Sequence, residues 1–341
     1  MNVVSLPIQE GGARWDAWVG PRTMTVTDLW AWRLIVRDAY GMGSHFLCVE
    51  RGGQIAGSLG LFEVKHAIFG HYLTTAPFGN DGGLHAPDDE ARDALLTEAR
   101  ALADRLGVAY LVIRCREREL PGFRVDSHYR SALLDLPDGS EALWSRLPAK
   151  TRNQVRRGIK EGFSFDAGPD QMDAFLDVFH AHMRDLGSPA HSRRYYEAIC
   201  SRLPGNAEFL IVRDGARGAA GALLLWTNGI AMNIHTVSLR EFNKRCPNYL
   251  VYWRMMERSI ERGCRQLDMG RSEVGSGNLD FKFNWEPREI VLTQNYYLRT
   301  IPEPPYLDPR NPKYAVAIAA WRRMPVWLTR RIGPRLIGGL A

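Results

Sequence analysis

The segment DMGRSEVGSG, from Asp268 to Gly277, places polar side chains and glycines directly after a predicted strand, Arg265 to Met269. Ligands commonly bind at the carboxyl ends of strands in α/β sheets. Arg271 and Ser272 are able to contact phosphate or carbonyl oxygens there, and the glycines let the backbone approach a ligand closely. The glycines match no P-loop or dinucleotide pattern, so an ordinary flexible turn explains the same letters. We expect Arg271 and Ser272 to bind substrate.

Two further polar residues, Asn233 and His235, alternate with apolar ones on a strand predicted from Ile230 to Val237. Successive side chains of a strand point to opposite faces, so these two are expected on the same face, where they would line an acceptor groove. Histidine titrates near neutral pH, which makes His235 a candidate general base. A hydrogen-bonded structural histidine fits the pattern equally well.

A basic segment precedes these strands. Lys150, Arg152, Arg156 and Lys160 lie in a predicted helix, and the last three are four residues apart on one face. Such a stripe suits a diphosphate or a tRNA backbone, and it also suits a solvated helix face. Tyr249, in the first turn of a later predicted helix, is a candidate for contact with donor phosphates or a packing residue.

Several catalytic patterns are missing from the sequence. It contains no G-x-S-x-G, no H-E-x-x-H, and five cysteines that are never spaced as C-x-x-C. Transfer of an acyl group to an amine needs none of them. It needs a deprotonated amine, a carbonyl held in range, and positive charge or N–H groups where the oxyanion develops. We therefore expect no metal site and no tightly bound cofactor.

The elements that would position these residues occur twice. The segment from Phe46 to Leu59 recurs, with one residue inserted, from Phe209 to Leu223, each time as strand, glycine turn and strand. A third strand, a helix that ends at a glycine and a further strand follow in both copies, the helices being predicted over 87–106 and 247–262. This order resembles the GNAT acyltransferase unit, in which a helix N-terminus receives the donor's phosphates. An unrelated pair of α+β lobes is the alternative.

Length and composition agree with two lobes. A chain of 341 residues is long for one core, because domains usually hold roughly 100 to 200 residues. Lys and Arg outnumber Asp and Glu by 44 to 38, which mildly favours phosphate-bearing partners. The sequence has no apolar run long enough for a membrane span and no signal-peptide pattern, and its scattered cysteines suit a reducing compartment. We expect a cytoplasmic protein.

Three stretches together resemble the FemAB-like acyl- and aminoacyl-transferases, in particular the FemAB-related proteins of exosortase and PEP-CTERM systems in Gram-negative bacteria. They are the basic segment Leu147 to Gly162, the helix that begins at Pro247 and leads into DMGRSEVGSG, and FKFNW from Phe281 to Trp285. The family motif has glycine where this chain has Glu286, so the turn after Trp285 is expected to differ.

The resemblance implies a role for Lys282. It places a lysine there that contacts phosphate or the developing oxyanion. A surface lysine whose stem packs along Phe281 and Trp285 is the alternative interpretation of the same residues. FemAB relatives add an amino acid or acyl group to an amine, and take it from aminoacyl-tRNA or, in wider GNAT groups, from acyl-coenzyme A.

The C-terminal segment from Tyr314 to Leu340 mixes apolar and aromatic residues with five arginines and contains no acid. Such a segment suits the anionic inner face of a membrane, where a lipid-linked sugar would wait. It suits packing across the two lobes equally well, with Pro325 and Pro334 dividing it into short helices.

We therefore expect an α/β (α+β) protein of two tandem GNAT-like lobes, each a mainly antiparallel sheet flanked by helices, over 1–140 and 141–300, with a basic helical tail over 301–341. The expected activity is transfer of an acyl or aminoacyl group to an amine of a peptidoglycan or exopolysaccharide precursor, from aminoacyl-tRNA or acyl-CoA. Alternatives are an acyl-CoA-dependent N-acyltransferase of exopolysaccharide biosynthesis and a non-catalytic nucleic-acid-binding scaffold. The candidate catalytic residues are Lys282 and His235, and the candidate substrate-binding residues are Arg271, Ser272, Asn233, Tyr249, Lys150, Arg152 and Arg156.

Overall fold

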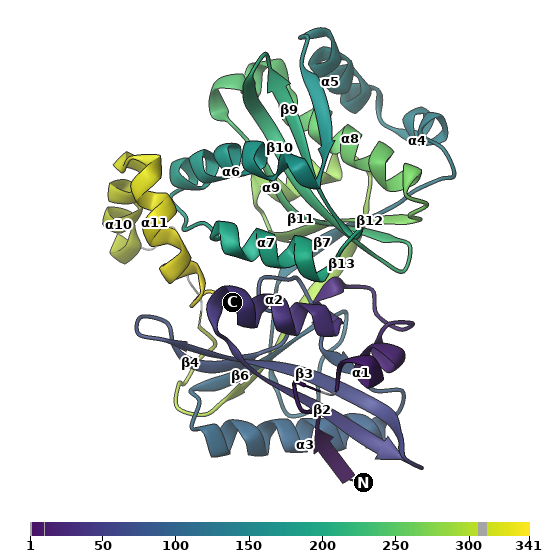
Figure 1. Ribbon diagram of the computed structural model, residues 1–341, viewed down its shortest axis with the longest axis vertical. Coiled ribbons are helices and arrows are strands. Elements are labelled where there is room, and N and C mark those ends of the chain that lie inside the picture. The colour runs from purple at the N-terminus through teal and green to yellow at the C-terminus, as the bar shows by residue number, and fades with distance from the viewer. Residues whose placement is uncertain (1, 10, 306–311) are drawn as a thin grey trace. The chain divides into compact units, whose positions relative to one another are not determined.

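The computed structural model describes residues 2–9, 11–305 and 312–341 (Figure 1). The chain forms two compact units. Unit 1 comprises Met1–Arg130, Ile290–Tyr306 and Gly338–Ala341, and unit 2 comprises Ser131–Glu289 and Leu307–Ile337. The two GNAT-like units expected from the repeat are therefore present, each with its own strands and helices.

Unit 1 is a sheet in the order β1-β2-β3-β4-β6, with β5 beside β3. Figure 1 shows α3 on one face of this sheet and α1 and α2 on the other. The strands pair antiparallel except β4 and β6, which are parallel. Its elements are β1 (Asn2–Ser5), α1 (Gly12–Val19), η1 (Val26–Asp28), α2 (Trp30–Tyr40), β2 (Gly43–Arg51), β3 (Gln54–His66), β4 (Gly70–Thr74), β5 (Leu84–His85), α3 (Asp89–Leu106) and β6 (Tyr110–Arg116).

Local sequence explains where α3 begins and ends. The carboxylate of Asp88 accepts the N–H of Ala91 at 2.8 Å, an N-cap, and Gly107 ends the helix with a φ of 66°. The apolar face predicted for this helix packs into the core of unit 1, where Leu95 and Ala99 are fully buried. A fully buried leucine side chain such as Leu95 contributes about 1.5–3 kcal/mol relative to an exposed one.

Unit 2 repeats the plan in the order β12-β11-β10-β9-β8. The strands are antiparallel except β11 and β12. In Figure 1, α8 lies on one face of the sheet and α6 and α7 on the other. Its elements are α4 (Ser140–Arg146), α5 (Ala149–Lys160), β8 (Ser164–Gly168), η2 (Pro169–Gln171), α6 (Met172–Leu186), α7 (Arg193–Arg202), β9 (Ala207–Asp214), β10 (Arg217–Thr227), β11 (Ile230–Ser238), η3 (Arg240–Arg245), α8 (Pro247–Glu261), β12 (Gln266–Glu273), α9 (Gly277–Phe283), α10 (Pro312–Arg323) and α11 (Val326–Ile337).

Two long strands pass from one unit into the other. β7 (Arg124–Asp135) begins in unit 1 and ends in unit 2, and β13 (Arg288–Leu298) begins in unit 2 and pairs with β6 of unit 1. Each unit thus contains a strand segment from the other half of the chain. The expected limits of 1–140 and 141–300 take no account of this exchange, because a linear sequence carries no mark of which half a strand pairs with.

Candidate active site

The parallel strands β11 and β12 of unit 2 pair only at their beginnings. Their register runs from Ile230 opposite Gln266 to Met232 opposite Asp268, and no pairing continues beyond it although both strands do. Where two strands diverge, their facing N–H and C=O groups are left for side chains, water or a ligand to bind. The diverging ends are therefore a place where an extended polar ligand is able to add to β11.

Asn233 connects the two strands where they part. Its side-chain amide donates to the carbonyl oxygen of Met269 at 3.2 Å, and its own side-chain oxygen accepts the hydroxyl of Thr236 at 2.8 Å. Gly270 follows with a φ of 84°, and a Cβ at this position would lie 3.0 Å from the Asn233 carbonyl oxygen. A glycine is therefore required for the backbone of β12 to turn this close to β11.

Lys282 of α9 reaches the same point. Its ammonium donates to the carbonyl oxygens of Gly270 (2.7 Å) and Arg271 (3.2 Å), which leaves its third N–H for another acceptor. The residue is 3% exposed, so it is no surface lysine. Burial lowers its pKa to about 8, while the Asp268 carboxylate opposes this shift and the Arg271 guanidinium adds to it. The side chain is still mainly an ammonium at neutral pH.

Asp268 fixes the backbone at Gly270 and interacts with the charge of Lys282. Its carboxylate is buried and accepts the N–H of Gly270 at 2.8 Å and the hydroxyl of Ser131 at 2.5 Å. A buried carboxylate needs such donors, and here it also offsets the charge of Lys282. Strand β7 thereby contributes Ser131 to the cluster.

Arg271 and Ser272 follow on β12, as predicted from the motif. Arg271 is exposed, and its positive charge contributes to the lowering of the Lys282 pKa. Ser272 is buried, and its hydroxyl oxygen accepts the side-chain amide of Asn278 at 3.0 Å. We call Asn233, Asp268, Gly270, Arg271 and Lys282 the β12 cluster.

His235 does not join the β12 cluster, and the prediction that it shares a face with Asn233 is wrong. The register against β10 shifts between Leu223, opposite His235, and Leu224, opposite Asn233, which leaves Ile234 as a bulge. A bulge changes the alternation of side chains. Asn233 therefore lies toward β12 and α8, whereas the His235 ring packs 4.9 Å from Phe179 of α6.

The surroundings of His235 suit a structural histidine. Its ring is 5.4 Å from His191 and 6.0 Å from Tyr196, and burial lowers its pKa to about 4. Burial also lowers the pKa of nearby His180 to about 4. Both rings are thus neutral at pH 7, and the role of His235 as a general base stays a prediction.

The basic helix α5 and Tyr249 lie beside the end of α9. The Thr151 hydroxyl donates to the carbonyl oxygen of Asn284 at 2.6 Å, and the Asn284 amide lies 3.5 Å from the Tyr249 hydroxyl. Lys150 and Arg152 are the sequence neighbours of Thr151 in this helix.

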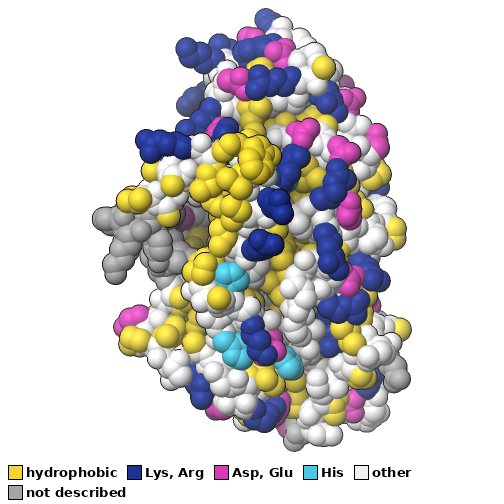
Figure 2. Space-filling view, turned by 60° about the vertical axis from the view of Figure 1, so that its left-hand side comes forward, with side chains coloured by type: hydrophobic (Ala, Val, Ile, Leu, Met, Phe, Trp, Pro, Cys, Tyr) yellow, Lys and Arg dark blue, Asp and Glu magenta, His cyan; other side chains and the backbone are white. Residues whose placement is uncertain are grey.

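Arg156, the next residue of the predicted stripe after Arg152, lies one turn further along α5. Its guanidinium is 5.3 Å from the centre of the Trp144 ring, and it donates to the Asn153 side chain. Lys and Arg side chains are spread among Asp and Glu over the face in Figure 2, without one large basic patch.

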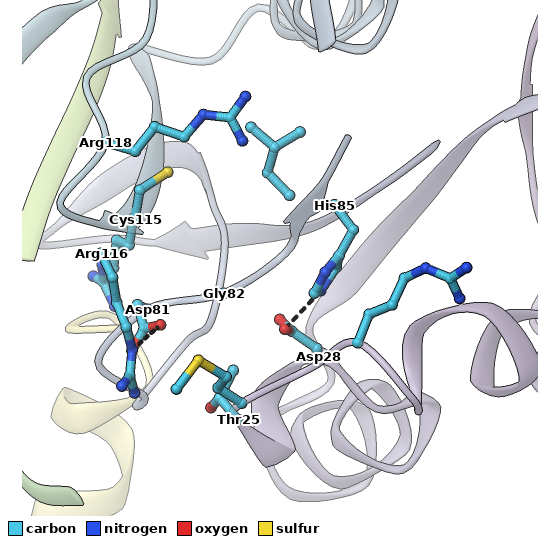
Figure 3. Close-up of a pocket in the computed structure, with 12 residues that line it drawn as sticks. Thr25, Asp28, Asp81, Gly82, His85, Cys115, Arg116 and Arg118 are labelled. Atoms are coloured by element: carbon cyan, nitrogen blue, oxygen red, sulfur yellow. Dashed lines mark hydrogen bonds and ion pairs between the residues drawn. The ribbon is translucent and has the colours of Figure 1, made fainter. Parts of the chain in front are cut away.

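A second cluster, which the sequence did not point to, lines a cavity of about 220 Å³ in unit 1 (Figure 3). Four arginines and two aspartates line it, a balance of +2 before His85 is counted. Cys115 lines it too, but burial raises the pKa of its thiol to about 12, so it is no thiolate nucleophile. The lining residues are Arg22, Met24, Thr25, Asp28, Asp81, Gly82, Leu84, His85, Arg114, Cys115, Arg116 and Arg118.

Two ion pairs face each other across this cavity. Nε2 of His85 lies 2.8 Å from Oδ2 of Asp28, and the Arg116 guanidinium donates to Asp81 at 2.7 Å. Figure 3 shows these pairs on opposite sides. The balance of charge favours an anionic ligand, such as a phosphate or carboxylate. Asp28 and His85 are 57 residues apart in the sequence, and no spacing rule relates them.

Groups of three or more His, Cys, Asp or Glu placed to hold a metal ion are absent from the described residues. Across the same residues, we find no helix with the length and apolar content needed to cross a bilayer.

Comparison with known proteins identifies the fold. Residues 149–282 match the family model described as an acetyltransferase (GNAT) domain. The chain is similar to the solved structure of FemX, with 15% identity and a TM-score of 0.65 over 93% of this chain and 100% of that one. It is also similar to a tandem GNAT protein from the clavulanic acid biosynthesis pathway, with 14% identity and a TM-score of 0.55 over 89% of this chain and 99% of that one.

A third similar structure is the C-terminal domain of a putative lysylphosphatidylglycerol synthetase from Agrobacterium fabrum, with 14% identity and a TM-score of 0.57 over 96% of this chain and 97% of that one. No curated protein sequence matches the chain. The chain has the FemAB-like tandem GNAT fold, and this fold and the GNAT domain support an acyltransferase.

Proposed function

We propose that this protein transfers an acyl or aminoacyl group to an amine of a cell-envelope precursor, of peptidoglycan or exopolysaccharide. The observation that carries the proposal is the buried ammonium of Lys282 at the point where β11 and β12 diverge. It lies within the residues that match the GNAT domain. The names of two similar structures, FemX and the lysylphosphatidylglycerol synthetase, motivate an envelope acceptor.

The β12 cluster supplies what the reaction needs. When the acceptor nitrogen attacks the acyl carbonyl, negative charge develops on the carbonyl oxygen, and a pre-oriented donor in a dry site lowers that barrier most. The third N–H of Lys282 is such a donor, because the other two are held by Gly270 and Arg271. Exposed Arg271 is placed to bind a phosphate of the donor.

The two units differ in how they would treat the donor's phosphates. Helix α8 of unit 2 begins with Pro247 and has no acidic residue in its first turn, and the Arg157 charge acts on the neighbouring Cys246. Helix α3 of unit 1 carries Asp89 and Glu90 in its first turn, beside its cap. Because a helix N-terminus attracts anions unless acids already occupy it, we assign the donor to unit 2.

The cavity of unit 1 is proposed separately as a binding site for an anionic ligand. Sugar-nucleotide and lipid-linked precursors carry phosphates, and peptide precursors carry carboxylates. Arg22, Arg116 and Arg118 supply cations for either group.

The donor is tested by incubating the protein with radiolabelled aminoacyl-tRNA or acyl-coenzyme A, together with precursors extracted from a strain that lacks the gene. We expect label to move from one donor into the precursor fraction. Transfer from acyl-coenzyme A alone assigns the N-acyltransferase activity. If neither donor yields labelled precursor while tRNA is retained on the protein, the nucleic-acid-binding alternative is correct and the proposal is wrong.

The tail adds a second element to the proposal, contact with an anionic membrane surface. Its inner face packs on unit 2, where Trp321 is buried and Gly333 contacts the backbone of Ala190. Its outer face carries Val316 and Trp327, which are 78% and 66% exposed. Hydrophobic side chains bordered by Lys and Arg are visible in Figure 2. An exposed tryptophan amid arginines suits the lipid headgroup region.

Replacing Trp327 with Ser is expected to weaken binding to vesicles of phosphatidylcholine and phosphatidylglycerol at least tenfold, measured by co-sedimentation, because the ring no longer enters the interface. The matched control is Ile68→Ser, since Ile68 of unit 1 is 69% exposed. Pure phosphatidylcholine vesicles should bind the wild type weakly. Equal binding of both variants would remove membrane contact from the proposal and leave the transfer reaction standing.

A further inference from the structure

The positive charges that line the cavity of unit 1 are not all balanced by its carboxylates. The Arg116 guanidinium is paired with Asp81 at 2.7 Å, and that of Arg114 donates to two backbone oxygens. Arg118 differs, because its guanidinium makes no hydrogen bond or ion pair with another residue that the structure describes. In Figure 3 its side chain extends toward the His85 side of the cavity. A cation placed in this way is available to an anionic ligand.

A second cation, Arg22, borders the same cavity from the segment before η1. Its guanidinium lies 3.7 Å from the centre of the Trp18 ring and donates to the Trp18 carbonyl oxygen at 2.7 Å. Among the described residues it has no carboxylate partner. These contacts orient the side chain but leave its charge uncompensated, and a guanidinium has five N–H groups, so others remain for a ligand.

The Asp28–His85 pair is the part of the cavity wall whose charge is able to change near neutral pH. Asp28 is buried, and its carboxylate accepts the hydroxyl of Thr23 at 2.7 Å and the backbone N–H of Gly83 at 2.5 Å. It also lies 2.8 Å from Nε2 of His85. Because Asp28 occupies Nε2, Nδ1 is the ring nitrogen left for a ligand. In the neutral ring Nδ1 carries a lone pair, which repels an anion, whereas in the protonated ring it donates.

The loop between β4 and β5, which fixes this carboxylate, has a strained backbone. Gly82 and Gly83 have φ values of 133° and 96°, and a Cβ on Gly82 would collide with Oδ1 of Asp28. In the same loop, Ala76 and Phe78 have positive φ values of 46° and 62°. Such conformations persist only where the surroundings enforce them, and they cluster at active sites and ligand-binding sites. The loop therefore supports a binding function for the cavity wall that it forms.

We propose that this cavity binds the dianionic phosphate group of a larger molecule, with Arg22, Arg118 and protonated His85 as its donors. Three separate donors suit the three oxygens and two charges of a phosphate better than a singly charged carboxylate. The cavity of about 220 Å³ is smaller than the ~300–1,000 Å³ pockets that hold whole drug-sized ligands, so it suits one charged group. The inference rests on the anion site proposed for unit 1 and is independent of the transfer reaction.

The groups that face His85 determine how this binding depends on pH. Burial lowers the pKa of His85 and the Arg22 guanidinium adds to this, but the Asp28 carboxylate and, more weakly, Asp81 raise it, and the net direction is upward. The other ionisable groups of the cavity come from β6 and the segment after it, and are Arg114, Cys115, Arg116 and Arg118. These arginines stay charged and the thiol stays neutral near pH 7. Affinity for a dianion should therefore rise as the pH falls through the pKa of His85, because the protonated ring adds a third donor.

The first probe is sulfate, a tetrahedral dianion that does not titrate near neutral pH, so that any pH dependence of its binding belongs to the protein. We expect calorimetric titration of the full chain to show about tenfold tighter binding at about pH 6 than at about pH 8.5, since a nearby opposite charge shifts a pKa by ~1–3. Acetate should bind more weakly than sulfate at both pH values. Because linkage is reciprocal, sulfate should in turn raise the pKa of His85, followed by the NMR signals of its ring.

Two variants assign the donors. Arg118→Met should lower sulfate affinity about tenfold at both pH values, because a hydrogen bond to a charged group is lost. Its matched control is Arg105→Met, since Arg105 of α3 is exposed and pairs with Glu98 at 2.7 Å outside the cavity. His85→Gln should bind sulfate as the wild type does at high pH but gain nothing on acidification. Its matched control is His71→Gln, because His71 contacts Glu63 at 2.7 Å outside the cavity.

Sulfate binding that is equal at both pH values, with an unchanged pKa of His85, overturns the inference and leaves the anion site standing; this measurement needs no variant to fold. If the folded wild type binds sulfate at neither pH, the anion site fails as well, whereas the transfer reaction is judged by its own labelled-donor assay. Glycerol 3-phosphate and inorganic phosphate distinguish the source of the group. We expect the ester to bind more tightly, and tighter binding of inorganic phosphate would contradict the assignment to a larger molecule.

Discussion

Replacing Lys282 with Met lowers kcat about 10²- to 10³-fold in our account, because the developing oxyanion loses its charged donor. Methionine has nearly the length of lysine and fills the same space, so the contacts of α9 with β12 are kept. The measurement is the transfer of label under saturating donor and acceptor. A fall in affinity at unchanged kcat would instead make Lys282 a binding residue.

The stability of the same variant separates a functional from a structural lysine. Lowering the pKa from 10.5 to about 8 means that the buried ammonium costs about 3 kcal/mol at neutral pH. Two hydrogen bonds to carbonyl oxygens, at about 1 kcal/mol each, offset part of this cost. Lys282→Met should therefore leave the free energy of unfolding within about 2 kcal/mol of the wild type.

Arg33→Met is the matched control for Lys282→Met. Arg33 is also buried, donates to the carbonyl oxygens of Leu6 and Ser44, and lies over the Trp30 ring, without a place in either cluster. It should lose stability but keep its turnover per folded molecule. If Lys282→Met behaves in the same way, the lysine is structural and its assigned role is wrong.

Acidification is expected to loosen unit 2 before unit 1. His235 and His180 have pKa values of about 4 in the folded chain, against 6.5 for free histidine, and burial also lowers the pKa of His191. Arg330 adds to the shift of His180 and Asp177 opposes it. Between pH 6.5 and 4 the unfolded chain binds these protons and the folded chain does not. Stability is therefore present above pH 6.5 and is lost as the pH falls toward 4.

The loss amounts to about 3 kcal/mol for each of the two histidines at the end of this range. Hydrogen exchange read peptide by peptide is the suitable measurement, since two units need not unfold together. Peptides of α6, α7 and β11 should lose protection between pH 7 and 5 more than those of α3, after correction for intrinsic rates. In His235→Phe, which cannot bind a proton, part of this difference should vanish; the same difference as in wild type would contradict the assigned role of this histidine.

Much of the architecture is local and was predictable. Phe46 to Leu59 and Phe209 to Leu223 each form the predicted hairpin of two strands. Pro247 begins α8, because the fixed φ of proline suits the first residue of a helix. Gly107 ends α3, because glycine adopts the left-handed conformation there without strain. The motif after Met269 and the lysine of FKFNW meet because the strand and the short helix that carry them are neighbours in sequence.

What could not be predicted depends on tertiary pairing. The bulge at Ile234 places the side chains of His235 and Asn233 on different faces of the sheet. It arises from the register against β10, and no glycine in the sequence indicates it. No feature of the sequence indicates that β7 and β13 each extend from one unit into the other. The Asp28–His85 pair forms because η1 and the loop before β5 meet in space, and periodicity carries no information on such a meeting.

The central claim is that the chain attaches an acyl or aminoacyl group to an envelope precursor through the β12 cluster. Mass spectrometry of precursors from a deletion strain, complemented with the wild-type gene or with Lys282→Met, tests it most directly. We predict that the deletion accumulates a precursor lighter by one acyl or aminoacyl group, that the wild type restores its mass, and that the variant, although folded, does not. Identical precursor masses in all strains would contradict the claim.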